Sequence, residues 1–291
     1  MIKAALVQFE PQTLQPAHNF ERIAQFIEAE GEAADLILFP ELVNTGYVEP
    51  VALGGPITVD VPDYGQALWQ ACAELDGQEL QHMVELAAKH RVHLVLGLGL
   101  RDPLLRGVMR NTSVLIAPTG LVGYYTKVHQ WHNEKLYFTP GDRIDTWQGP
   151  GCKLGMQICY DSRFPELTRI MALQGADIIT NIWAGSGIDG AAVADEQLFV
   201  HRAYTRAMEN GVFFLSCNRV GVQADRRFLG RSCAVAPSGR VIGALEHDRE
   251  DVLRVDLDLD EIAAYRSFTG IWTDRNPALY ARYLSPSRLP D

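Results

Sequence analysis

The chain has 291 residues, of which 47% are hydrophobic and 21% are charged, a balance typical of globular proteins. Its formal net charge of −10 disfavours a nucleic-acid surface, because phosphate binding requires clustered lysine and arginine, and the sequence contains no such cluster. No apolar stretch approaches the ~18 residues that a membrane span needs. We therefore expect neither a nucleic acid nor a membrane as a partner.

The five cysteines are odd in number, lie far apart and include no C-x-x-C pair. The N-terminus leads directly into the apolar run IKAALVQF and shows no secretory signal. Free thiols fit a reducing compartment. These features predict a cytoplasmic protein.

Short apolar runs rich in Val, Ile and Leu alternate with longer amphipathic segments. In chain order the predicted elements are the strand AALVQF, a helix at about 17–30, the strand DLILFP, a helix at about 78–90, and the strands VHLVLGLGL and NTSVLIAP. After a loop-rich middle follow the strand KLGMQICYD, a helix at about 164–175, the strand DIITNIW, a helix at about 193–210, and the strands VFFLSCN and SCAVAPSGRVIG. This alternation predicts an α/β fold with a largely buried sheet.

The tail VLRVDLDLDEIAAYR first alternates apolar and acidic residues, as in a half-exposed strand, and then becomes helical. No linker, low-complexity segment or short fixed-period repeat interrupts the sequence, so we predict a single domain over residues 1–291. The segments VLIAPTGLVG and AVAPSGRVIG each place a Pro-Thr/Ser-Gly turn between two strands. This echo suggests two similar halves.

Three polar residues lie where α/β folds place functional groups, at or just beyond the ends of apolar strands. Glu41 follows DLILFP, Lys127 follows GLVGYYT, and Cys159 ends KLGMQI. Each also has a purely structural explanation: a helix first-turn acid, a solvated loop charge and a small core residue, respectively.

Together the three residues form a coherent chemical set. A thiol with a pKa of about 8.5 needs a base or a cation to supply thiolate at neutral pH. Glu41 can take the proton, and the Lys127 ammonium can stabilise both a thiolate and the oxyanion that forms when sulfur attacks a carbonyl. This hypothesis requires the three side chains to meet in space.

The segments FPELVNTGY, YYTKVHQW with NEKLYFTPG, and GMQICYDSRFPELTR resemble the three signature regions of the nitrilase superfamily, the carbon–nitrogen hydrolases. They occur in that family's order. The similarity continues through RAMENGVFFLSCNRVG, FLGRSCAVAPSGRVIG and DRNPALY, so it covers nearly the whole chain.

The resemblance implies a four-layer α-β-β-α sandwich, usually paired into homodimers or larger homo-oligomers, with a Glu-Lys-Cys triad. Glu41 matches the general base, Lys127 the cation that stabilises the tetrahedral intermediate, and Cys159 the nucleophile. Glu134 matches a second glutamate that supports the lysine and positions substrate. The Tyr160 amide is the expected backbone half of the oxyanion hole.

The implied reaction is hydrolysis of a small amide to ammonia and a carboxylic acid through a cysteine thioester, without a metal or organic cofactor. Thr126 departs from the basic residue that many relatives carry before the lysine. Family members with true nitrilase activity commonly have Trp-Glu after the cysteine, whereas this chain has Tyr160-Asp161. That dipeptide resembles the amidase and carbamoylase branches and disfavours nitrile hydrolysis.

Two other functions stay open. An N-carbamoyl amine or N-carbamoyl amino acid amidohydrolase would use the same triad. A non-catalytic interaction protein on the same fold is a further alternative, which the intact set of matched residues disfavours.

Substrate contacts are expected from three further side chains. Arg163 can pair with a substrate carboxylate, or equally form a structural ion pair with Glu166 or Asp161. Tyr47 and Trp183 are candidate aromatic walls, or ordinary core residues.

The segment HQWHNE brings His129, His132 and Glu134 close together in sequence. It lacks the H-E-x-x-H spacing and a cysteine pair that would complete a zinc site, so we expect no metal there. A Cys159–His129 pair is also conceivable, but it lacks the support of the resemblance.

Overall fold

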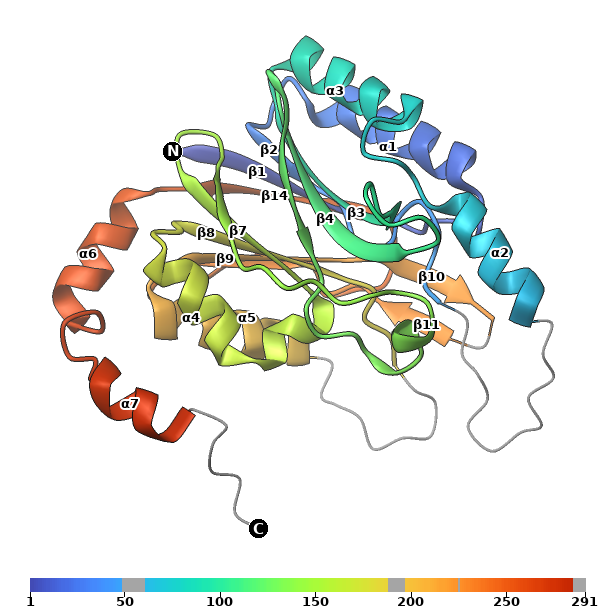
Figure 1. Cartoon of the computed structure of the whole chain (residues 1–291). Helices are drawn as coiled ribbons and strands as arrows, with labels where there is room; N and C mark the ends of the chain where they lie inside the picture. Colours follow the sequence, from blue (N-terminus) through green and yellow to red (C-terminus); the bar gives the residue numbers. More distant parts are fainter. Residues whose placement is uncertain (49–60, 188–196, 225, 285–291) are drawn as a thin grey trace.

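Two six-stranded β-sheets lie face to face, and helices cover their outer faces (Figure 1). The structure is a computed structural model that describes residues 1–48, 61–187, 197–224 and 226–284. It forms the α-β-β-α layers that the family resemblance implies.

The first sheet has the strand order β14-β1-β2-β3-β4-β5. Its strands are β14 (Asp251–Leu257), β1 (Ile2–Gln8), β2 (Leu36–Leu38), β3 (His93–Arg101), β4 (Met109–Ala117) and β5 (Gly120–Thr126). Strands β1, β2 and β3 run parallel, and β14, β4 and β5 pair antiparallel at the two sides.

The second sheet has the order β13-β12-β9-β8-β7-β6. Its strands are β13 (Val241–Ala244), β12 (Cys233–Val235), β9 (Phe213–Asn218), β8 (Ile178–Trp183), β7 (Lys153–Ile158) and β6 (Thr146–Gln148). Here β7, β8 and β9 are parallel, with antiparallel strands on both sides. The two sheets therefore repeat one topology, and the two Pro-Thr/Ser-Gly segments form the corresponding hairpins β4–β5 and β12–β13, which confirms the two similar halves.

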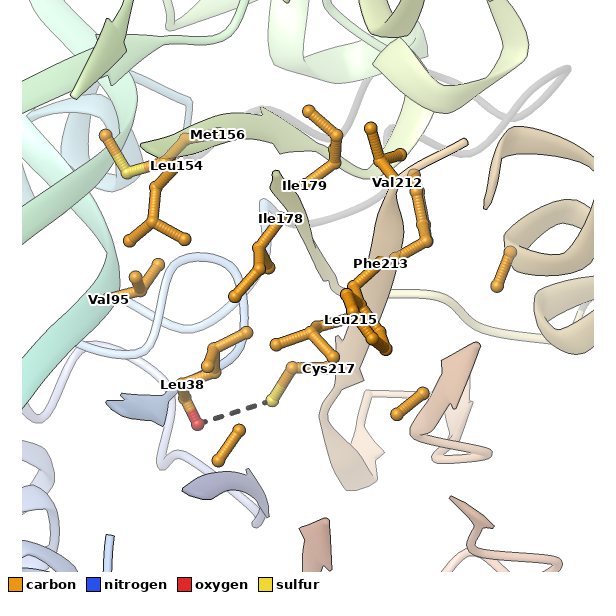
Figure 2. Packing of buried hydrophobic residues seen from close by; sticks show 14 of the residues in the cluster. Leu38, Val95, Leu154, Met156, Ile178, Ile179, Val212, Phe213, Leu215 and Cys217 are labelled. Carbon is orange, nitrogen blue, oxygen red and sulfur yellow. Dashed lines mark hydrogen bonds between the residues drawn. The ribbon is translucent and has the colours of Figure 1, made fainter. Parts of the chain in front are cut away.

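The core follows the two-residue period of the strands. In β1, Ile2, Ala4 and Leu6 pack between the sheets, whereas Ala5 and Val7 face the outer helices. Figure 2 shows Leu38 and Val95 of the first sheet opposite Leu154, Ile178 and Leu215 of the second. Because both faces of each sheet are covered, the central strands are apolar runs rather than alternating ones.

Helices α1 (Pro16–Glu30) and α3 (Gln78–His90) cover the first sheet, and α4 (Pro165–Leu173) and α5 (Leu198–Asn210) cover the second (Figure 1). The first three match the predicted helices at 17–30, 78–90 and 164–175. The prediction at 193–210 begins outside the described residues, and its described part is α5.

The remaining elements connect or extend these layers. They are the helices α2 (Val61–Ala71), α6 (Asp260–Thr269) and α7 (Pro277–Leu284), the 3-10 helices η1 (His132–Leu136) and η2 (Cys159–Arg163), and the hairpin strands β10 (Val220–Gln223) and β11 (Arg226–Leu229). Across the described parts of the chain, no helix has the length and apolarity needed to cross a bilayer.

Candidate active site

The turns that follow β2 and β8 meet where the two sheets face each other. The Glu41 N–H donates to the Trp183 carbonyl (3.3 Å), and the Ala184 N–H donates to Glu41 Oε2 (2.8 Å). These turns occupy corresponding places in the two halves of the fold. Glu41 is thus held by the opposite sheet as well as by its own.

Gly97 of β3 allows the Glu41 turn to pack against the sheet. A Cβ atom at position 97 would lie 2.2 Å from the Pro40 carbonyl oxygen and 2.7 Å from Glu41 Cα. The Val43 N–H donates to the Gly97 carbonyl at 2.8 Å, which fixes the turn beside the strand. The position of Glu41 therefore requires a glycine, which has no side chain, at position 97.

The Glu41 carboxylate is fully buried and accepts three hydrogen bonds. Oε1 accepts from Lys127 Nζ (2.6 Å) and from Asn111 Nδ2 (2.7 Å), while Oε2 accepts from the Ala184 N–H. A carboxylate has about four acceptor positions. One position, on Oε2, is left for a further donor.

Lys127 lies between two buried carboxylates. Besides Glu41, its Nζ donates to Glu134 Oε1 at 2.8 Å, and the Tyr47 hydroxyl donates to the same oxygen at 2.6 Å. Lys127 follows β5 directly, and its N–H donates to the Asn111 carbonyl. Glu134 comes from η1. The buried polar side chains therefore come from four segments: the turn after β2, strand β4, the residue after β5, and η1.

The electrostatics of this group keep the lysine charged. Burial opposes the ammonium, but the carboxylates of Glu134 and Glu41 outweigh it and raise the pKa of Lys127 above its ordinary value. Burial raises the pKa of Glu134 against the opposing effect of Lys127. Burial, followed by the charge of Glu134, raises the pKa of Tyr47 well above its ordinary value, so the phenol is a neutral donor.

Cys159 is the first residue of η2 and directly follows β7, in a strained conformation at the bend where the two elements join. Its φ of +48° lies in the left-handed region, which residues other than glycine seldom adopt. The bend is held from within by Ser162, whose hydroxyl donates to the Cys159 carbonyl (2.8 Å), and from α5 by Arg206, whose Nε donates to the Ser162 carbonyl (3.0 Å).

Asp161 connects this bend to the segment after Lys127. Its Oδ2 accepts from the Ile158 N–H (3.1 Å) and the Tyr125 hydroxyl (2.8 Å). Its Oδ1 accepts from the His129 N–H and contacts His129 Nδ1 at 2.8 Å, while the histidine ring stacks on Phe164. His129 thus serves Asp161 and is not a partner of the thiol.

The sulfur of Cys159 lies within the field of the buried charges. Burial, and next the negative charge of Glu41, raise its pKa well above the ordinary value, although Lys127 and the Ala184 N–H favour the thiolate. The resting group is therefore a thiol. A reaction of this sulfur as a nucleophile would therefore have to include its ionisation.

Comparison with known proteins identifies the family. The family model described as carbon-nitrogen hydrolase matches residues 3–267. The chain belongs to the carbon–nitrogen hydrolase family. It is 32% identical to a Schizosaccharomyces pombe protein named as a probable nitrilase, over 97% of this chain and 98% of that protein.

Two further matches extend this assignment. An (R)-stereoselective amidase from Pseudomonas sp. is 34% identical over 91% of this chain and 88% of its own length. The crystal structure of a carbon–nitrogen hydrolase from Helicobacter pylori superposes with a TM-score of 0.81 at 25% identity and covers 98% of both chains. The sequence resemblance and the predicted fold are both confirmed.

In this carbon–nitrogen hydrolase, the predicted substrate-contacting residues have different surroundings. Tyr47 is buried against Glu134, and Trp183 is 4% exposed at the end of β8. Tyr160 is half-buried, with its ring edge against Trp131. Arg163 is exposed and lies over the rings of Trp131 (5.3 Å) and Tyr160 (5.6 Å).

The structural alternative for Arg163 was an ion pair with Asp161 or Glu166, and this alternative is wrong. Neither pair occurs, and both oxygens of Asp161 are already bound by other groups. The described residues also contain no cluster of three or more His, Cys, Asp or Glu side chains arranged to hold a metal ion.

The sequence did not indicate several residues of this carbon–nitrogen hydrolase site. Asn111 is the first residue of the predicted strand NTSVLIAP. Nothing in that pattern predicts that its side-chain amide donates a hydrogen bond to Glu41. The Ala184 contribution is a backbone amide, which the identity of the side chain cannot reveal. Outside this hydrogen-bonded group, Arg202 lies over the Trp183 ring, within a predicted amphipathic helix where arginine is ordinary.

Proposed function

We propose that this carbon–nitrogen hydrolase cleaves a small amide through a thioester on Cys159, with Glu41 as general base and Lys127 as the stabilising cation. The observation that carries the proposal is the buried Lys127 ammonium, bound at 2.6 Å to Glu41 and at 2.8 Å to Glu134, beside the strained Cys159 bend. Without such chemistry, two carboxylates and one ammonium would be costly to bury.

The first half-reaction begins with the neutral thiol. As the sulfur attacks the amide carbonyl, the free acceptor position on Glu41 Oε2 takes the thiol proton. The carbon–sulfur bond forms and the carbonyl π pair moves to oxygen. Glu41 then passes the proton to the amide nitrogen, the carbon–nitrogen bond breaks and ammonia leaves.

The oxyanion is stabilised by two donors in this mechanism. An ammonium has three donor hydrogens, and Glu41 and Glu134 accept two from Lys127, which leaves one for the substrate oxygen. The Tyr160 N–H is in the first turn of η2, where helix geometry leaves amides without intrahelical acceptors. Glu134 and Tyr47 position the ammonium.

The second half-reaction repeats these steps with water. Glu41 takes a proton from water as the water oxygen attacks the thioester carbonyl, and the carbon–sulfur bond breaks to release the carboxylic acid. The sulfur leaves as thiolate and regains its proton from Glu41. The cycle balances without a cofactor or a redox step.

The same geometry serves an N-carbamoyl compound, whose cleavage releases carbon dioxide with ammonia. The relatives are named both as nitrilase and as amidase. We favour the amide because a relative matched over 91% of this chain is named an amidase, whereas a relative named N-carbamoylputrescine amidase matches over 58% of it.

The test is ammonia release from butyramide, succinamic acid, N-carbamoyl-β-alanine and butyronitrile by wild type, Cys159→Ala and Cys152→Ala. Cys159→Ala is expected to abolish release while the protein stays folded, because it removes the nucleophile and little packing. Cys152 is also buried but lies outside the site, so Cys152→Ala should keep turnover. Wild-type rates from Cys159→Ala would contradict the proposal, as would release from butyronitrile alone.

A further inference from the structure

Helix α5 carries two arginines one helical turn apart, Arg202 and Arg206, and only one of them has hydrogen-bonding partners. Arg206 is buried, donates to the Ser162 carbonyl at 3.0 Å and pairs with Glu209 at 2.9 Å. Arg202 is half-buried and lies over the Trp183 ring, 5.8 Å from its centroid. Within the parts of the chain that the structure describes, Arg202 makes no hydrogen bond or ion pair.

Trp183 adds a second donor without an acceptor. Its side chain is 4% exposed and packs edge-on against Phe199 of α5, with ring centroids 5.0 Å apart. Its indole Nε1 is buried, and among the described residues it finds no hydrogen-bond acceptor. Buried donors are nearly always paired in folded proteins, so this indole N–H is available to an acceptor from outside the chain.

The backbone of Trp183 connects these side chains to the proposed reacting groups. The Trp183 carbonyl accepts from the Glu41 N–H, and the next residue is Ala184, whose amide binds Glu41 and favours the Cys159 thiolate. Burial and then the positive charge of Arg163 lower the pKa of Arg202 to about 10, while a negative charge on Cys159 raises it. The guanidinium of Arg202 therefore interacts electrostatically with both Cys159 and Arg163.

We propose that the Arg202 guanidinium and the Trp183 indole N–H bind a carboxylate of the substrate next to Cys159. This inference rests on the proposed amide hydrolysis and narrows its substrates to amides that carry a carboxylate, such as ω-amides of dicarboxylic acids or N-carbamoyl amino acids. A guanidinium suits this role because its planar donors match the two oxygens of a carboxylate.

Charge balance favours the same substrates. Glu41, Glu134 and Lys127 together carry a net negative charge, which would repel an anionic substrate from the buried site. Arg202 offsets that repulsion, and Arg163 adds a second positive charge nearby. A cationic substrate, such as an N-carbamoyl amine with a free ammonium group, would instead face two arginines without carboxylate partners.

The test compares succinamic acid with butyramide, two primary amides of similar size of which only the first carries a carboxylate. We expect the kcat/KM for succinamic acid, divided by that for butyramide, to fall about 10²-fold in Arg202→Met. The substrate carboxylate would then be bound without a positively charged partner. Arg202→Lys should recover part of the ratio, since it keeps the charge but loses the planar donors. Trp183→Phe keeps a ring, removes the N–H and should lower the ratio by a smaller factor.

Arg240→Met is the matched control, because Arg240 is an exposed arginine on the surface that pairs with Glu261. It removes the same charge and should leave the ratio at the wild-type value. A ratio that stays within threefold of wild type in Arg202→Met would overturn the inference, and so would equal losses of activity on both amides.

A binding measurement separates this inference from the proposed function. Calorimetry would compare succinate binding to Cys159→Ala and to Cys159→Ala with Arg202→Met. Loss of succinate binding in the double variant supports the carboxylate subsite, whether or not wild type hydrolyses an amide. If wild type hydrolyses none, the proposed function is wrong while the subsite still stands. Equal binding by both proteins overturns the subsite, and butyramide hydrolysis by wild type would then leave the proposed function standing.

Discussion

At the scale of single residues, the site joins a permanent cation to a thiol that is neutral at rest. Lys127 is held between Glu41 and Glu134, and its raised pKa keeps it protonated at neutral pH, as the proposed stabilisation of an oxyanion requires. Its charge does not suffice to ionise Cys159, because burial and Glu41 raise the pKa of the thiol. A base that acts during the attack is therefore needed, and the free acceptor position on Glu41 Oε2 suits that role.

The ionisation of Cys159 can be tested in the free protein. A thiol ionises when the pH exceeds its pKa, and a raised pKa moves this step upward from the ordinary value of about 8.5. We therefore expect no thiolate absorbance between about pH 6 and pH 8 in the native protein. The measurement is an ultraviolet titration of wild type against Cys159→Ala.

The other cysteines do not obscure this titration. Burial raises the pKa to about 12 at Cys72, Cys152 and Cys233, and it raises the pKa of Cys217 as well. Protein unfolded in guanidinium is the control, since its five thiols should titrate at the ordinary value. A step below pH ~8 that Cys159→Ala lacks would show that Lys127 ionises the thiol before substrate binds.

At the scale of elements, the site is assembled from strand ends that approach one another very closely. The turn after β2 contacts β3 through Gly97 and contacts the turn after β8 through two backbone hydrogen-bonding groups. The geometry of the candidate site is thus set by backbone packing.

Gly97→Ala tests this packing. The added Cβ would meet the Pro40 carbonyl and Glu41 Cα, which are backbone atoms that cannot rotate away. We expect a loss of about 1–3 kcal/mol in the free energy of unfolding and a fall in kcat/KM of about 10²-fold through displacement of Glu41. Denaturant unfolding and steady-state kinetics measure the two effects.

Gly65→Ala is the matched control. A Cβ there has its nearest neighbour at 3.9 Å, within helix α2, where alanine is the better helix former. It should preserve activity and leave stability equal or slightly higher. If Gly97→Ala behaved in the same way, the close contact with β3 would not determine the position of Glu41.

Apolar periodicity predicted most of these elements because buried strands and helices are continuous in sequence. Helix α1 was expected at about 17–30 and spans Pro16–Glu30. Helix α2 was missed because its sequence, VPDYGQALWQA, contains a proline and a glycine that weaken a helical pattern. The resemblance indicated Glu41, Lys127, Glu134 and Cys159.

The supporting contacts of the site could not be predicted in the same way. Asn111 lies 70 residues from Glu41, and the Ala184 amide lies 143 residues from it. Such contacts depend on the register of whole sheets, which no local pattern encodes. For the same reason, the lack of partners at Arg202 is visible only after folding.

At the scale of the whole molecule, the site belongs to both halves of the fold. Glu41, Lys127 and Glu134 come from the chain before β6, and Cys159 and Ala184 come from the second sheet and its turns. The two sheets share a core in which, for example, the Cys217 sulfur donates to the Leu38 carbonyl at 3.5 Å (Figure 2). Neither half holds the complete set of reacting groups.

The C-terminal helix α7 stands apart from this shared core (Figure 1). Each of its eight residues is exposed, including Leu279, Tyr280, Tyr283 and Leu284. Isolated helices shorter than about 12 residues are marginal in water, and exposed apolar groups of this kind mark interaction surfaces. We therefore expect α7 to pack on a second copy of the chain, in line with the homo-oligomer that the family resemblance implies.

Replacing Tyr283 and Leu284 together by aspartate tests this assembly. These side chains are 81% and 69% exposed, so the change should leave the fold of one chain intact and shift the protein to a smaller species in sedimentation velocity. Leu104→Asp is the control, because Leu104 is 88% exposed in the loop between β3 and β4 and receives the same apolar-to-acid change. If the α7 variant and the control sediment alike, α7 does not form the contact between copies, and an oligomer would have to use another surface.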